Sequence, residues 1–145
     1  MKPTRRVARE IALQLLFERE ANPEVPAERR AAYAKERLDF PQLERFALDL
    51  VEGVATRQAE LDAVLSQGAD NWSVERMPGV DRAILRMGAY EILHGGTPPA
   101  VAINEALELC KKFSAPEAVS FVNGVLDRIA GGRAANPPAT DAGHA

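Results

Sequence analysis

The chain has 145 residues, of which 46% are hydrophobic and 27% are charged, enough for one domain or two closely fused bundles. Its formal net charge of -3 excludes a protein that coats nucleic acid over its whole surface, so any such contact must come from a local basic patch. The single cysteine, Cys110, excludes an intramolecular disulfide and indicates a reducing compartment. No apolar stretch approaches the roughly 18 residues of a membrane helix and no secretory signal is visible, so we expect a cytoplasmic protein.

Helical periodicity dominates the first half of the sequence. From Thr4 to Glu20 apolar residues recur at the spacing of one helix face, and two prolines interrupt the pattern soon afterwards. The charged, alanine-rich segment from Ala27 to Arg37 predicts a short solvated helix. One long helix is then predicted from Pro41 to about Leu65, with Gly53 marking a bend.

Glycines and prolines between residues 67 and 79 form the main interior break. Beyond it, periodicity predicts helices over Val80–Leu93, Val101–Phe113 and from Ser114 to about Ile129. Ser114 and a glutamate three residues later fit a capping box, which would begin the last helix. A glycine inside a helix costs about 1 kcal/mol relative to alanine, so Gly124 predicts a close helix crossing.

These elements predict an all-α fold of about six to seven helices. We expect a single helical domain over residues 1–130, built from two packed three-helix sub-bundles at about 1–66 and 79–130. Residues 131–145 are rich in proline and small side chains, and they predict a disordered tail.

The sequence offers little material for catalysis. Its two histidines, His94 and His144, lie near a helix end and in the predicted tail, and there is one cysteine, so thiol–imidazole, serine–histidine and Cys/His metal sites are not expected. Glu105 and Glu108 occupy neighbouring helical positions, which is more typical of a solvated face than of an acid pair. We therefore expect neither an enzyme nor a bound cofactor or metal.

Basic residues cluster at the start of the first predicted helix, where the helix dipole disfavours positive charge. Arg5, Arg9 and Phe17 follow one ridge of this helix, which places an aromatic ring two turns beyond the basic end. Guanidinium groups bind phosphates and a ring can stack on an unpaired base, so the ridge is typical of an RNA contact. A solubilising terminus with Phe17 in the core explains the same spacing.

The helix from Val80 to Leu93 carries a second basic stripe, formed by Arg82, Arg86 and Tyr90. Arg82 and Arg86 repel unless a carboxylate or a partner lies between them. For Arg86, pairing within the domain and contact with RNA are both open. Asp81, in the first turn, suits the helix dipole and is also placed to face a protein partner.

Several blocks in this order resemble the NusB family of bacterial transcription antitermination factors, and the resemblance spans the chain from Lys2 to Ile129. The last two blocks are highly specific in combination. The blocks are Arg5-Arg6-Val7-Ala8-Arg9-Glu10, Leu50-Val51-Glu52-Gly53-Val54, Asp81-Arg82-Ala83-Ile84-Leu85-Arg86, Tyr90-Glu91, Val101-Ala102-Ile103-Asn104-Glu105-Ala106 and Phe121-Val122-Asn123-Gly124-Val125-Leu126-Asp127.

The resemblance implies a protein that pairs with NusE, a ribosomal small-subunit protein, and binds the single-stranded boxA element of ribosomal RNA leaders. The pair would help RNA polymerase pass terminators. The candidate RNA-binding residues are Lys2, Arg5, Arg6, Arg9, Phe17, Arg86, Phe121 and Asn123, and the candidate partner-binding residues are Arg76, Asp81 and Arg82. The segment 21–40 matches the family poorly, and a homodimer that covers the basic patch is a further possibility.

Two other interpretations compete with an RNA-binding adaptor. One is a helical adaptor that binds only proteins and has a merely solubilising basic end. The other is suggested by a similar domain that precedes RNA methyltransferase domains, although this chain has no predicted α/β unit to hold a methyl-donor cofactor.

Overall fold

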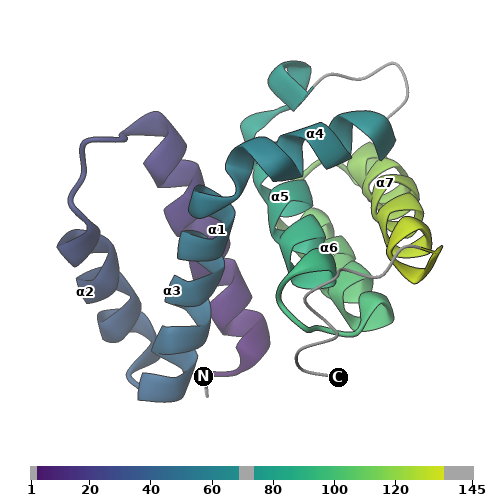
Figure 1. Ribbon diagram of the computed structural model, residues 1–145. Helices are drawn as coiled ribbons and strands as arrows, with labels where there is room; N and C mark the ends of the chain where they lie inside the picture. The colour runs from purple at the N-terminus through teal and green to yellow at the C-terminus, as the bar shows by residue number, and fades with distance from the viewer. Residues whose placement is uncertain (1–2, 69–73, 136–145) are drawn as a thin grey trace. The chain divides into compact units, whose positions relative to one another are not determined.

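A computed structural model describes residues 3–68 and 74–135 of the chain. Within these ranges the chain forms seven α-helices and one 3₁₀ turn and no strand, which confirms the predicted all-α fold (Figure 1). Backbone contacts divide the chain into two compact units, Met1–Arg57 and Gln58–Ala145.

The first unit is a three-helix bundle of α1 (Arg5–Ala21), α2 (Ala27–Leu38) and α3 (Pro41–Thr56). Helices α1 and α2 both pack against α3 (Figure 1). The apolar stripe expected on α1 is buried as predicted, which removes from water the side chains of Ala8, Ile11, Ala12, Leu15 and Leu16. Helix α2 buries little beyond Ala34 and Leu38, as expected of a solvated helix.

The predicted long helix from Pro41 to Leu65 is wrong, because the chain turns at Arg57 and begins a new helix, α4 (Gln58–Gly68). The Arg57 N–H donates to the Gly53 carbonyl at 3.1 Å and closes α3. Helix α4 then packs on helices of the second unit, so the apolar stripes before and after Arg57 serve different cores. The units consequently divide at Arg57 and not within residues 67–79.

The second unit continues with the 3₁₀ turn η1 (Val74–Arg76), α5 (Gly79–Leu93), α6 (Pro99–Phe113) and α7 (Pro116–Ala135). Helices α5, α6 and α7 pack on one another, and α4 packs on α5 and α7 (Figure 1). A Cβ atom built on Gly88 of α5 would lie 2.7 Å from a methyl group of Leu126 of α7. The missing side chain at Gly88 therefore allows α5 and α7 to approach closely.

Three details of α7 differ from the sequence expectation. Ser114 does not cap it, because the Ser114 hydroxyl donates to the Asp81 carboxylate and α7 begins at Pro116. Gly124 makes no close crossing, since a Cβ there would meet no atom within 4 Å. The helix extends through residues 131–135 of the predicted tail, and residues 136–145 lie outside the described ranges.

Candidate nucleic-acid interface

Helix α1 begins with two exposed arginines, Arg5 and Arg6, and its first turn contains no acidic residue. Thr4 caps the helix, and its hydroxyl oxygen accepts a hydrogen bond from the Val7 N–H at 3.2 Å. A positive charge at this end interacts unfavourably with the helix dipole, which lowers helix stability by roughly 0.3–1 kcal/mol per group. The exposed start of α1 is thus a basic patch that helix stability alone does not favour. Lys2, the other basic residue expected here, lies outside the described residues.

Phe46 of α3 lies against this patch. The guanidinium carbon of Arg5 is 4.5 Å from the centre of the Phe46 ring, and that of Arg9 is 5.1 Å from it. Both distances fall within the roughly 6 Å range of a cation–π interaction. Phe46 was not among the predicted RNA-binding residues, because it stands at the edge of the apolar stripe of α3 and carries no separate signal. We call these three residues the Arg5–Phe46–Arg9 cluster.

The ridge predicted along α1 is not exposed throughout. Arg9 is only 5% exposed and Leu13 only 3%, whereas Phe17 is 48% exposed. A ridge at i, i+4, i+8 drifts around a helix of 3.6 residues per turn, and here its middle turns toward the core. Arg6, about three turns before Phe17, shares the exposed face of α1 with it. The alternative that places Phe17 in the core is wrong, and Arg9 is buried.

A second pairing of an arginine with a ring lies on α2. The Tyr33 hydroxyl donates to Gln14 Oε1 of α1 at 2.8 Å, and the Arg37 guanidinium carbon lies 3.8 Å from the centre of the Tyr33 ring. The Tyr33 hydrogen bond fastens α2 to α1, whereas the Arg37 contact with the Tyr33 ring lies within α2. The hydrogen bond between these two helices helps to hold the first unit together.

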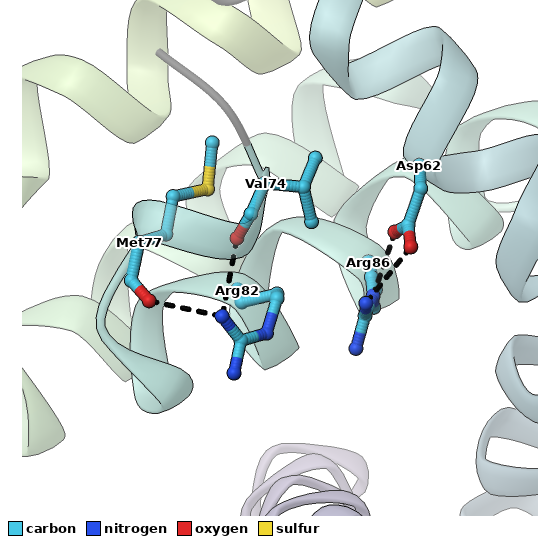
Figure 2. Close-up of polar contacts among 5 residues, drawn as sticks. All are labelled: Asp62, Val74, Met77, Arg82 and Arg86. Atoms are coloured by element: carbon cyan, nitrogen blue, oxygen red, sulfur yellow. Dashed lines mark hydrogen bonds and ion pairs between the residues drawn. The ribbon is translucent and has the colours of Figure 1, made fainter.

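Arg86 does not face solvent in the second unit. Its Nε donates to Asp62 Oδ1 at 2.8 Å and its Nη2 donates to Asp62 Oδ2 at 2.9 Å (Figure 2). The residue is 8% exposed, so the guanidinium is held between α5 and α4 by a bidentate ion pair. This geometry corrects the assignment of Arg86 to RNA contact, because its donors already serve a carboxylate of the same unit.

Arg82 also binds within its own unit. Its Nη1 donates to the carbonyl oxygens of Val74 at 3.1 Å and of Met77 at 3.0 Å, and so ties η1 to α5 (Figure 2). This nitrogen fixes the backbone before α5, and the expected role of Arg82 in partner binding stays a prediction. Arg76, in η1, is exposed.

Asp81 and Phe121 lie in the lining of one pocket of about 250 Å³. The other lining residues are Met77, Pro78, Ala115, Glu117 and Ala118, which gives an apolar wall with two carboxylates. Asp81 is 8% exposed and accepts the hydrogen bond from Ser114. Burial of the nearby Cys110 thiol and, to a smaller extent, the negative charge of Asp81 raise the pKa of this thiol to about 12, so this cysteine stays protonated. The pocket brings together a residue expected at the partner and one expected at RNA.

The exposed part of the last block lies on the outer face of α7. Asn123 and Gly124 are both exposed, and the bare backbone at Gly124 has open space beside it. A glycine here lowers helix stability and has no packing role, so this stretch of α7 remains a candidate for close approach by a ligand.

Three further observations concern metal binding, His94 and membrane spans in the described part of the chain. No group of three or more His, Cys, Asp or Glu side chains in residues 3–68 and 74–135 is arranged to hold a metal ion. His94 Nε2 lies 2.6 Å from Glu60 Oε2, and this contact joins α5 to α4. Over the same ranges, every helix is too short or too polar to cross a membrane.

Residues 6–131 match the NusB family. The transcription antitermination protein NusB of Solibacter usitatus (strain Ellin6076) is 45% identical over 131 residues, which cover 87% of this chain and 88% of the relative. The protein of the same name from Salinispora arenicola (strain CNS-205) is 42% identical over 131 residues, 88% of this chain and 96% of its own.

Solved structures agree with the sequence relatives. T. maritima NusB matches with a TM-score of 0.78 and 31% identity, over 90% of this chain and 93% of that chain. A chain in a crystal structure of the antitermination factors NusB and NusE in complex with dsRNA matches with a TM-score of 0.79 and 26% identity, over 88% of this chain and 96% of that chain. The chain therefore belongs to the NusB family.

Proposed function

We propose that this protein is an RNA-binding transcription antitermination factor, and not an enzyme, that acts in the cytoplasm. Together with NusE it binds a single-stranded, boxA-type element in the leaders of ribosomal RNA operons and helps RNA polymerase read through terminators. The naming of the curated relatives and the likeness to a structure that contains NusB, NusE and RNA support this proposal.

The main support for RNA binding is the start of α1, which combines exposed basic side chains with an exposed aromatic ring on the same helix. Arg5 and Arg6 are exposed there, and the exposed ring of Phe17 lies on the same helix. Arginine binds phosphate in two parallel hydrogen bonds, and an exposed ring stacks on an unpaired base at about 1–3 kcal/mol per base. With a net charge of -3 the rest of the surface adds little attraction, so a protein partner must supply further affinity.

The proposed partner surface is the pocket lined by residues of α5 and α7 and by Met77, Pro78 and Ala115, which precede these helices. Its apolar lining and the carboxylates of Asp81 and Glu117 suit a partner segment that presents an apolar side chain beside a basic one. Arg82 supports this surface by holding the Met77 carbonyl, and the exposed Arg76 stands in the adjoining turn.

Fluorescence anisotropy with a boxA-type RNA and a scrambled RNA, each with and without NusE, tests the proposal. We expect the boxA-type RNA to bind best, and more tightly when NusE is present. Equal, weak binding in all four mixtures would contradict sequence-selective RNA binding. Partner binding that persists without any RNA crosslink to α1 would favour an adaptor that binds only proteins.

Arg5→Ala tests whether RNA binding depends on the basic start of α1 or only on the net charge of the protein. We expect a loss of about tenfold in RNA affinity and a salt dependence flatter by about one unit. Arg29→Ala is the matched control, because Arg29 is also an exposed arginine of the first unit but belongs to α2. Equal losses in the two variants would mean that only net charge matters and would remove α1 from the RNA surface.

A further inference from the structure

Two positive side chains share one aromatic ring at the start of α1. Arg5 and Arg9 are four residues apart on the helix, and both guanidinium groups lie within 5.1 Å of the centre of the Phe46 ring. Like charges at this spacing repel each other, and the helix dipole opposes both. The ring quadrupole of Phe46 offsets this repulsion, because its face is negative.

The two arginines are held differently. Arg9 is only 5% exposed and makes further contacts besides the ring. Arg5 is exposed, and within residues 3–68 and 74–135 its guanidinium group makes no hydrogen bond or ion pair. A stacked guanidinium uses its flat face and leaves the N–H groups in its plane available. Arg5 therefore presents its donors to solvent from a side chain whose position is already restricted.

We propose that Phe46 is a positioning residue for RNA: its ring holds Arg5 so that the in-plane N–H groups meet a phosphate, while the buried Arg9 adds positive charge near the same ring. This inference rests on the proposed function, because it concerns the same start of α1. It goes beyond it by making Arg5, and not Arg9, the direct phosphate contact and by assigning a role to α3.

The energetic reason is preorganisation. A free arginine side chain loses much of its rotamer freedom when it binds a phosphate, which costs up to about 2 kcal/mol. The Phe46 ring restricts Arg5 before binding, so part of that loss has already occurred in the free protein. Removing the ring should consequently weaken RNA binding even though Phe46 itself touches no RNA.

Phe46→Leu and Phe46→Tyr test the role by anisotropy with the boxA-type RNA and NusE over a series of salt concentrations. Leucine fills much of the volume but has no quadrupole, whereas tyrosine keeps the ring. We expect Phe46→Leu to weaken RNA binding by about three- to tenfold and Phe46→Tyr to retain it. Tyr33→Leu, which removes the Arg37 stack in the same unit, should leave RNA binding unchanged.

A double-variant cycle distinguishes positioning from loss of structure. In an Arg5→Ala background, Phe46→Leu should cause no further loss of RNA affinity, because the side chain that it positions is gone. Three outcomes would each overturn the inference. Phe46→Leu could lose the same RNA affinity in both backgrounds, it could bind RNA normally, or it could lose no more RNA affinity than Tyr33→Leu. If Arg5→Ala itself binds RNA normally, it is the proposed RNA surface that fails, whatever Phe46 does.

Discussion

Asp62→Ala should lower the free energy of unfolding by about 2 kcal/mol, because it removes the carboxylate that accepts two hydrogen bonds from Arg86. A hydrogen bond to a charged group contributes about 1.5–3 kcal/mol. The Asp62 side chain is 29% exposed, so water recovers part of this value when the pair is broken. The Arg86 side chain, at 10% exposed, stays in place with less compensation for its charge.

Urea unfolding followed by far-UV circular dichroism measures the effect. Asp127→Ala is the control, because Asp127 is an exposed aspartate of the same unit and its loss should change stability by less than about 0.5 kcal/mol. Arg86→Met should also be destabilised, and combining it with Asp62→Ala should cost less than the sum of the two single changes, since no buried charge is then left behind.

The same variants decide whether Arg86 contacts RNA. Arg86→Met should bind the boxA-type RNA as the unaltered protein does once it is folded, because its donors serve Asp62. Two results would refute this reasoning. One is unfolding of Asp62→Ala at the same urea concentration as Asp127→Ala. The other is a loss of RNA affinity by Arg86→Met while its urea midpoint stays unchanged.

Three further predictions follow from packing, protonation and exposure. Gly88→Ala should destabilise the protein by about 1 kcal/mol and Gly124→Ala should stabilise it by up to about 1 kcal/mol, since a new methyl group meets packed atoms at the first and open space at the second; equal shifts in urea unfolding would contradict the close crossing. The raised pKa of Cys110, about 12, favours the protonated thiol, so its stabilising contribution is complete below pH 9.0 and is lost as the pH rises toward 12. Iodoacetamide at about pH 9 should label Cys110 only in urea, and rapid labelling of the folded protein would argue against this burial. Phe17→Ala should weaken RNA binding about fivefold or more and Phe17→Tyr should retain it, whereas equal binding by both would exclude stacking.

Local periodicity was sufficient for most of the helices. The stripe on α1 and the stripes on α5 and α6 each bury one face against the rest of their unit, so the spacing of apolar residues carries the information. The break at Arg57 had no such signal. No proline or glycine stands there, and the turn follows from α4 packing with α5 and α7, which no local pattern encodes.

The candidate site was less accessible to sequence reasoning, because its decisive contacts join residues far apart in the chain. Arg86 and Asp62 lie on different helices, as do Arg9 and Phe46, and neither pairing has a local signature. Spacing alone therefore placed Arg9 on an exposed ridge. Gly124 gave a clear signal that was interpreted wrongly, since its missing side chain faces solvent and the close crossing belongs to Gly88.

The close contact between Gly88 and Leu126 lies apart from the pocket, but the same two helices, α5 and α7, form both. Asp81 lies about two turns before Gly88 on α5, and Phe121 lies somewhat more than one turn before Leu126 on α7, so the walls of the pocket extend from the point where these helices touch. A larger residue at position 88 would push α5 and α7 apart where they touch and would therefore widen the pocket. On the proposed partner surface, a change at position 88 would therefore alter the fit of a partner without touching it.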